Sequence, residues 1–342
     1  MRLAHHEVVI ALKEPFVSNT GSTTRVRQSV VTLTWEGLVG LGTARGAAPA
    51  DLDACAPALA GASPFALREV LARLEHVGPA ALSAVDMALH DLLGKACGQP
   101  LHRLLGLDGL PAEPTALSIG ACTDEELVRR AERLAHWPIL KLKLTPEDTG
   151  RRVGVLRSVY GGRIRVDGNG SWSPDRALRV AEEIHRYDVE LLEQPVAPGA
   201  PDDLRHVHER SPVPVFADED CQGPDDVLRL SGRVTGINIK LLQCGGLARA
   251  RDMITLARGC GLKVMLGCKV ESVLGTTAMA QLAGLVDHLD LDGPLLLSDD
   301  PFTGVRIDHG RLALPTAPGI GVAPLEAPNR EDRHAAALRS AR

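Results

Sequence analysis

The sequence is poor in aromatic residues, which make up only 3% of its 342 positions, so aliphatic side chains must fill the core. It has no surplus of basic residues, because 38 Lys and Arg face 43 Asp and Glu and leave a formal charge of −5. This balance argues against nucleic acid or an anionic membrane as a partner. The longest uncharged stretches, such as 54–67, are interrupted by proline and are too short to cross a bilayer.

Cysteine is present but without a pattern that signals a disulfide framework or a zinc site. The seven cysteines are odd in number and include no C-x-x-C pair. The N-terminus reaches Glu7 before any long apolar run, which is unlike a signal peptide. We therefore expect reduced thiols in a cytoplasmic protein. The absence of G-x-S-x-G and H-E-x-x-H argues against those hydrolase classes.

The strongest pattern that is present is a repeat of short runs rich in Ile, Val and Leu, each followed by a helical stretch. From the second run onward the starts are 23 to 27 residues apart, the length of one βα unit. Eight such units in a row predict a (β/α)8-type barrel. The runs are 115–120, 139–144, 163–169, 189–195, 213–220, 236–242, 263–270 and 288–294.

The first 110 residues have a different pattern. Alternating polar and apolar residues predict antiparallel strands, and two later segments have a helical period, so we expect an α+β unit. We predict strands at 5–12, 25–35 and 37–42, helices at 65–74 and 79–93, and a late hairpin at 305–307 and 311–314. Pro111 and Pro114 mark the passage into the barrel, and the tail from residue 326 is expected to be weakly ordered. The predicted domains are 1–112, completed by 301–342, and 113–300.

Acidic residues recur at the predicted carboxyl ends of the strands, where such barrels place their active sites. Asp167, Glu193 and Asp218 end three successive strands, so their carboxylates should converge. Three close carboxylates repel one another unless a cation joins them, and oxygen ligands suit Mg²⁺. The alternative, that each acid is a solvated loop residue, is weakened by three occurrences in consecutive units.

Lysines occupy opposite sides of the predicted barrel mouth. Lys143 follows the second strand, with Lys141 two residues before it on the same face, and Lys240 follows the sixth. One lysine could remove a proton from a carbon beside a metal-bound carboxylate, while the other returns it on the opposite face. The alternative for each lysine alone is a strand-end side chain paired with a nearby acid.

These residues together resemble the enolase superfamily, in particular its muconate-lactonizing subgroup. The motifs are Lys-x-Lys, Asp-x-Asn-x-x-Trp from Asp167, Glu-x-Pro, Ala-Asp-Glu, and Asn-x-Lys-x4-Gly-Gly from Asn238, in this order over essentially the whole chain. The resemblance implies a (β/α)7β TIM-like barrel with an N-terminal α+β capping domain. It also implies one Mg²⁺ per subunit on Asp167, Glu193 and Asp218, and an acid/base pair of Lys143 and Lys240.

The residues at the end of the eighth strand distinguish the different reactions found within this subgroup. Asp290-Leu291-Asp292 resembles the Asp-x-Asp of dipeptide epimerases, which implies that both acids hold a substrate ammonium. The alternative is that they cap the turn at Gly293-Pro294. The resemblance also implies substrate contacts from further residues, namely Lys141, Ser118, Asn169, Cys268, Lys269 and Glu271.

We therefore predict an isomerase that epimerises the C-terminal residue of an L-Ala-L-Xaa type dipeptide, with L-Ala-D/L-Glu as one candidate, and that forms a homo-oligomer. Lys269 could neutralise an acidic substrate side chain or pair with Glu271. The segment 16–27 is expected to be a specificity loop that offers Arg25 and Arg27. The alternatives are a cycloisomerase, an o-succinylbenzoate synthase, an N-acylamino acid racemase, a Schiff-base aldolase, or a barrel that binds metal or peptide without turnover.

Overall fold

The N-terminal part of the chain is built on a three-stranded antiparallel sheet of order β1-β2-β3. The computed structural model describes residues 1–18, 21–109 and 113–325. In it the strands are β1 (Arg2–Ser18), β2 (Gly21–Trp35) and β3 (Leu38–Ala44). A two-residue turn joins β2 to β3, with Glu36 and Gly37 both at positive φ, as tight hairpins require. The three predicted strands are confirmed, but β1 and β2 are much longer than expected.

One long helix, α4, covers this sheet. Its strand-facing residues meet Gly40 and Gly42 of β3, where any side chain would collide with the backbone at Ala84 and Ala88. The predicted helix 65–74 is present as α3, and a 3-10 turn at Pro64–Ala66 precedes it. The helices of this part are α1 (Pro49–Asp53), α2 (Ala56–Leu59), α3 (Leu67–Arg73), α4 (Pro79–Ala96) and α5 (Leu101–Leu104).

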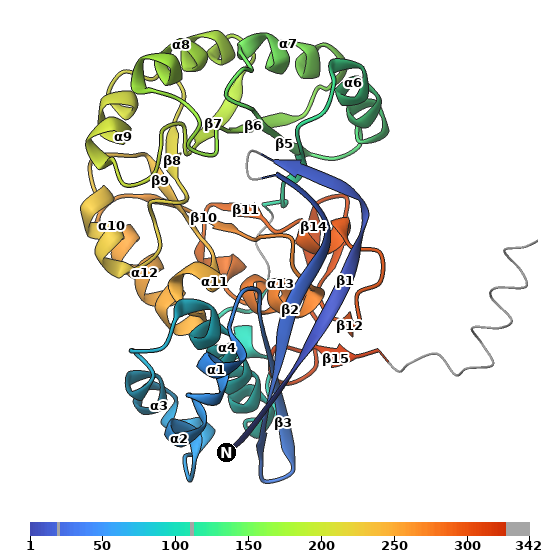
Figure 1. Ribbon diagram of the computed structural model, residues 1–342, viewed down its shortest axis with the longest axis vertical. Helices are drawn as coiled ribbons and strands as arrows, with labels where there is room; N and C mark the ends of the chain where they lie inside the picture. The colour runs from blue at the N-terminus through green and yellow to red at the C-terminus, as the bar shows by residue number, and fades with distance from the viewer. Residues whose placement is uncertain (19–20, 110–112, 326–342) are drawn as a thin grey trace, which may run out of the picture.

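The eight predicted βα runs form one parallel eight-stranded sheet in sequential order. The first and last strands also meet, since Ala116 N donates to Leu289 O at 3.0 Å, so the sheet closes into a barrel (Figure 1). Buried Val, Ile and Leu side chains dominate the core. The strands are β4 (Leu117–Ile119), β5 (Ile139–Lys143), β6 (Arg163–Asp167), β7 (Val189–Glu193), β8 (Val215–Ala217), β9 (Gly236–Ile239), β10 (Lys263–Gly267) and β11 (His288–Asp290).

Helices surround the barrel in the order that the sequence predicts (Figure 1). Thr123 and Ser173 cap two of them, accepting from the backbone nitrogens of Glu126 and Arg176. No helix among the described residues is long and apolar enough to cross a membrane. The helices are α6 (Asp124–Arg133), α7 (Gly150–Val159), α8 (Pro174–His185), α9 (Pro201–His208), α10 (Pro224–Leu230), α11 (Leu241–Cys244), α12 (Leu247–Gly259) and α13 (Val273–Ala280).

The last described segment returns to the N-terminal part. Asp91 of α4 accepts from Ile320 N at 2.9 Å, and Leu101 N donates to Gly319 O at 2.7 Å. The predicted hairpin is present as β13 (Arg306–Asp308) and β14 (Arg311–Ala313), flanked by β12 (Phe302–Thr303) and β15 (Ala323–Pro324). Pro111, the end of the predicted first domain at 112 and the tail from residue 326 lie outside the described residues, so the domain division stays a prediction.

Candidate active site

Carboxylates from three neighbouring strands meet at the carboxyl end of the barrel. Asp167 ends β6 and Glu193 ends β7, and the two are register partners, while Asp218 directly follows β8. All three are buried, with relative exposures of 0, 0 and 1%. The structure therefore brings the three predicted ligands together.

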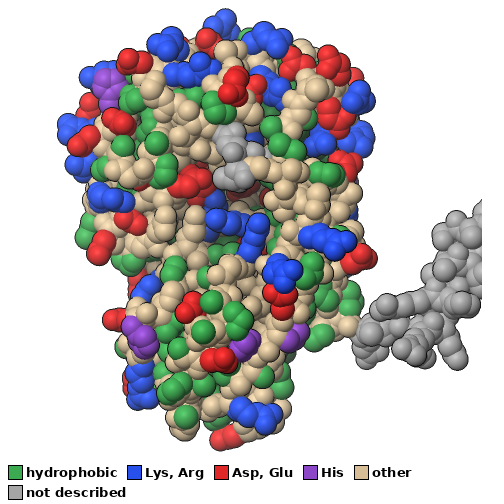
Figure 2. All heavy atoms as spheres, viewed as in Figure 1, with side chains coloured by type: hydrophobic (Ala, Val, Ile, Leu, Met, Phe, Trp, Pro, Cys, Tyr) green, Lys and Arg blue, Asp and Glu red, His purple; other side chains and the backbone are tan. Residues whose placement is uncertain are grey.

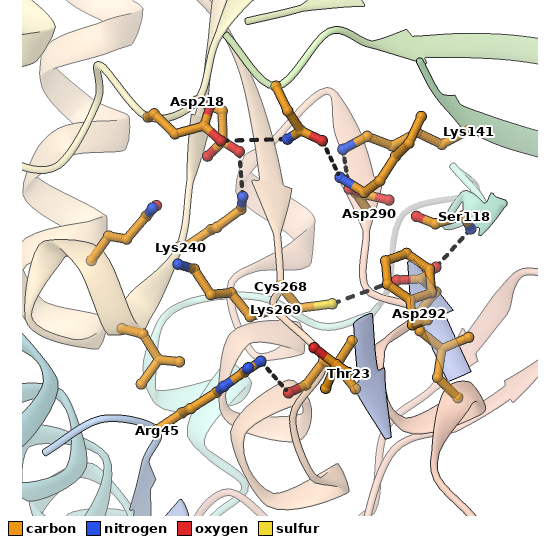
Figure 3. A pocket seen from close by; sticks show the side chains of 18 of the residues that line it. Thr23, Arg45, Ser118, Lys141, Asp218, Lys240, Cys268, Lys269, Asp290 and Asp292 are labelled. Carbon is orange, nitrogen blue, oxygen red and sulfur yellow. Dashed lines mark hydrogen bonds and ion pairs between the residues drawn. The ribbon is translucent and has the colours of Figure 1, made fainter. Parts of the chain in front are cut away.

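Three lysines surround this carboxylate cluster. Lys141 Nζ lies 2.7 Å from Glu193 Oε2 and 3.2 Å from Asp167 Oδ2. Lys143, on the same face of β5, donates to Asp167 Oδ2 at 2.7 Å and to Asn169 Oδ1 at 3.1 Å. Lys240 follows β9, the strand next to β8, and donates to Asp218 (Figure 3). Each lysine of the sequence prediction thus contacts a predicted metal ligand.

The charges of the cluster are not balanced by its protein partners. Burial raises the pKa of Glu193 to about 8, because the attraction of Lys141 does not offset burial and the repulsion of Asp167 and Asp218. For Lys240, burial favours the neutral amine, but Asp218 and Glu193 outweigh it and raise the pKa. The carboxylate neighbours of Lys240 therefore favour its charged ammonium form.

The same cluster fits a divalent cation. Asp218 Oδ1 is buried and has no hydrogen-bond partner among the described residues, and Asn238 Nδ2 orients Glu193 by donating to its Oε1 at 3.0 Å. An oxygen-only donor set with unpaired buried lone pairs is what Mg²⁺ prefers. Asp167, Glu193 and Asp218 would hold the ion.

A second acidic pair lies at the end of β11. Asp290 Oδ2 accepts from Lys141 Nζ at 2.7 Å, and Asp292 Oδ2 accepts from Ser118 N at 2.7 Å. Asp292 makes no side-chain cap on the 3-10 turn Gly293–Leu296, which removes the capping alternative for this residue. Burial and the neighbouring Asp290 raise the pKa of Asp292 to about 6. The pair thus places two buried carboxyl groups at this end of the barrel mouth, and its role toward a substrate ammonium stays a prediction.

A cavity of about 460 Å³ connects the carboxylate cluster with this acidic pair. Ser118, Asn169, Cys268 and Lys269, four of the residues predicted to contact the substrate, line this cavity. Cys268 lies against Asp292, with Sγ 3.7 Å from Oδ1 (Figure 3). Figure 2 shows basic side chains beside the hollow at the centre of this face of the molecule.

The segment 16–27 is not the loop that the sequence predicts. It is the end of a strand pair that reaches over the barrel mouth, with Phe16 paired to Thr23 in register and both lining the cavity (Figure 1). Residues 19 and 20 lie outside the described residues. Arg27 Nη1 donates to Glu7 Oε1 at 2.6 Å, and Arg27 does not line the cavity. The pairing of β1 with β2 is interrupted by an irregularity between Ala11 and Phe16 and resumes at Phe16.

Glu271 is placed behind the cavity wall. It is 2% exposed, its Oε2 lies against Gly275, and it makes no ion pair with Lys269 among the described residues. Burial raises the pKa of Glu271 to about 7 despite the positive charge of Arg45 and Lys240. Two charged residues of the cavity lining were not assigned from the sequence, Arg45 and Glu219. Glu219 could have been found because it follows Asp218 directly, whereas Arg45 reaches the site only through the fold.

Another group of metal-ligand types lies at the opposite, amino end of the barrel. Glu113, Glu190 and His288 place their ligand atoms within 4.8 Å of one another. Arg165 is fully buried between them and donates to Glu113 Oε1 at 3.1 Å, and Arg163 donates to Glu190 Oε1 at 2.7 Å. Two guanidinium groups already compensate these carboxylates, so this group does not carry the metal prediction.

Fold and site together define a barrel enzyme of the enolase type, and comparison with known families agrees. Residues 3–106 match the family described as mandelate racemase / muconate lactonizing enzyme, N-terminal domain, and residues 125–327 match enolase C-terminal domain-like. The chain belongs to the mandelate racemase / muconate lactonizing enzyme family of the enolase superfamily. The resemblance inferred from the five motifs is confirmed.

Relatives within this family are named dipeptide epimerases. The chain is 34% identical over 337 residues to the L-Ala-D/L-Glu epimerase of Bacteroides thetaiotaomicron, which covers 94% of this chain and 88% of that protein. The dipeptide epimerase of Enterococcus faecalis, complexed with Mg and L-Leu-L-Tyr, has a TM-score of 0.89 at 29% identity and covers 94% of this chain and 99% of its own. That of Methylococcus capsulatus, complexed with Mg and L-Arg-D-Lys, has a TM-score of 0.85 at 30% identity and covers 94% and 98%.

Proposed function

We propose that this protein is a Mg²⁺-dependent dipeptide epimerase acting on the C-terminal residue of an L-Ala-L-Xaa type dipeptide. The observation that carries the proposal is the position of two lysines around one carboxylate cluster. Lys143 ends β5 and Lys240 follows β9, which lie four strands apart in the eight-stranded barrel and so face one another. The names of the relatives support the same reaction.

The two ends of the cavity would orient the substrate. Asp290 and Asp292 are buried and acidic, so they would hold the α-ammonium of a dipeptide. The substrate carboxylate would lie at the carboxylate cluster, where bound Mg²⁺ would stabilise the negative charge that develops when the α-proton leaves. This orientation places the α-carbon of the C-terminal residue between Lys143 and Lys240.

Proton transfer would then need only these two amines. The Nζ of one lysine, as a neutral amine, takes the proton from the α-carbon, and the ammonium of the other gives a proton to the opposite face. The configuration inverts, and no other bond is made or broken. Mg²⁺ held by Asp218 and Glu193 would compete with the Lys240 ammonium for these carboxylates, which would favour the neutral amine of Lys240.

Exchange of the α-hydrogen in D₂O tests the proposal. The wild-type protein with Mg²⁺ should incorporate deuterium into L-Ala-L-Xaa dipeptides as it epimerises them. Lys143→Ala and Lys240→Ala should each lose epimerisation by at least about 100-fold, because each removes one of the two proton carriers. Lys263→Ala, at an exposed lysine on β10, is the matched control and should keep wild-type activity. A fully active Lys143→Ala or Lys240→Ala protein would overturn the two-base mechanism.

The expected homo-oligomer and cytoplasmic location complete the proposal as predictions. The seven cysteines are all free, which supports a reducing compartment. Size-exclusion chromatography with light scattering tests the first expectation, and a mass equal to one 36.4 kDa chain would contradict it.

A further inference from the structure

Five basic side chains line the cavity, and they divide into two groups. Lys141, Lys143 and Lys240 each contact a carboxylate of the cluster. Arg45 and Lys269 also line the cavity, but neither makes an ion pair with any residue that the structure describes. Two positive charges in the site are therefore without an ion-pair partner among the described residues.

These two cations come from different parts of the fold and meet at one place. Arg45 directly follows β3, and its Nη1 donates to Val270 O at 3.4 Å, which ties it to the segment that carries Lys269. In Figure 3 the Lys240 amino group points to Asp218, and the Lys269 and Arg45 side chains lie below it. Burial and the charges of Lys240 and Arg45 lower the pKa of Lys269, although Asp218 and Glu219 oppose this effect. Lys269 is therefore a partly buried amine with another cation, Arg45, tied to its own segment.

The internal carboxylate that could neutralise them does not do so. Glu271 feels the charge of both Arg45 and Lys269, but its side chain is buried against Gly275 and forms no ion pair with either. Asp290 and Asp292 are paired with Lys141 and with Ser118 N, at the other end of the cavity in Figure 3. Asp218 and Glu219 also line the cavity and act on Lys269 through their charge. Within the described part of the chain, however, Asp218 pairs with Lys240 and Glu219 forms no ion pair with Lys269 or Arg45, so both cations can accept an added carboxylate.

We propose that Arg45 and Lys269 bind a carboxylate on the side chain of the substrate's C-terminal residue, so that the preferred dipeptides end in an acidic residue. The inference rests on the proposed function, which assigns the α-carboxylate to the metal cluster and the ammonium to Asp290 and Asp292. The remaining substituent of the α-carbon lies beside Lys240, on the side of Lys269 and Arg45. Their two charges determine specificity there and take no part in proton transfer.

A comparison of isosteric dipeptides tests this specificity. The ratio of kcat/KM for L-Ala-L-Glu to that for L-Ala-L-Gln should exceed 1 in the wild-type protein. It should fall by roughly 10- to 100-fold in Lys269→Met and in Arg45→Met, because each loses a charge-assisted contact. The loss should appear mainly in KM, since the contact is made equally in the ground and transition states. Lys269→Arg should restore most of the ratio, and the exposed-lysine control Lys263→Met should leave it at the wild-type value.

The outcomes separate the two proposals. Wild-type exchange on L-Ala-L-Gln that equals or exceeds exchange on L-Ala-L-Glu overturns the acidic specificity and leaves the epimerase intact. An unchanged ratio in both methionine variants overturns the roles of Arg45 and Lys269. Absence of α-proton exchange with every dipeptide overturns the proposed function and this inference with it.

Discussion

At the scale of single residues, the charge of Asp290 should distinguish two classes of substrate. A dipeptide brings a free ammonium to the acidic pair, whereas an N-acylamino acid does not. Asp290 Oδ1 is buried and without a hydrogen-bond partner among the described residues, while Oδ2 accepts from Lys141. Asp290→Asn should therefore lower kcat/KM for an L-Ala-L-Xaa dipeptide by roughly 10- to 100-fold, because a charge-assisted contact is lost. Deuterium exchange at the α-carbon measures this loss.

The control for Asp290→Asn is the matching N-acyl substrate with the same C-terminal residue. Any exchange of the wild-type protein on this substrate should change little in the variant, since it has no ammonium to bind. Asp299→Asn, at an exposed position, checks for a general effect of the substitution. Equal losses on both substrates would contradict the ammonium site and favour another reaction of the subgroup, such as N-acylamino acid racemisation.

At the scale of secondary-structure elements, the network at the amino end of the barrel ties strands together. Arg165 of β6 is fully buried and contacts Glu190 of β7, Leu289 O of β11, and Glu113 before β4. Glu113→Gln removes one of the charges that compensate this guanidinium. The free energy of unfolding should fall by about 1–3 kcal/mol, because charged hydrogen bonds are lost around a buried cation. Urea denaturation at pH 7 measures the change.

The same substitution has a defined pH dependence. Burial raises the pKa of Glu113, but hydrogen bonds from His288 and Arg163 outweigh it and lower the pKa to about 2. A carboxyl group with a lowered folded-state pKa contributes stability above its unfolded pKa, near 4.5, and loses it as the pH falls toward 2. The difference in free energy of unfolding between wild type and Glu113→Gln should therefore have its full value at pH 7 and shrink below about pH 4.5. A difference independent of pH would show that shape, not charge, is responsible. Glu75→Gln, at an exposed position, should show neither effect.

The barrel elements were predictable because their signals are local. Each strand is a short apolar run, the spacing repeats, and the carboxyl ends of parallel strands lie at one end of the barrel, which brought Asp167 and Glu193 into register. The extended hairpin was not predictable, since Lys13, Glu14 and Pro15 interrupt the alternation and pairing resumes only at Phe16.

Long-range contacts explain what else the sequence did not reveal. Arg45 enters the cavity through a contact with Val270, which is 225 positions away along the chain. The pairing of Lys141 with Asp290 spans 149 positions. Residue type and position predicted that Lys141 would belong to the site. Which of the nearby carboxylates Lys141 contacts depends on the closed geometry of the barrel. Local pattern therefore predicts which residues reach the barrel mouth, and tertiary structure determines their partners.

At the scale of the whole molecule, the carboxylate cluster couples metal binding to folding. Asp167, Glu193 and Asp218 come from three strands and converge only in the folded chain, so Mg²⁺ should bind the native state in preference to the unfolded state. At 100 times its dissociation constant, a ligand stabilises the native state by about 2.7 kcal/mol. Differential scanning fluorimetry should show a rise in melting temperature of roughly 5 °C with MgCl₂ over NaCl of equal ionic strength. EDTA should reverse the rise.

Variants locate the ion that produces this shift. Asp218→Asn should lose most of the Mg²⁺-dependent rise, because it removes a negative charge and replaces one of the two carboxylate oxygens with an amide nitrogen, which does not bind Mg²⁺. Asp108→Asn, at an exposed aspartate, should keep the full rise. Glu113→Gln should also keep it, since Arg163 and Arg165 already compensate the acidic group at the amino end of the barrel. A rise that survives in Asp218→Asn and disappears in Glu113→Gln would place the ion at the amino end of the barrel, beside Glu113, Glu190 and His288, and would separate metal binding from the lysine pair.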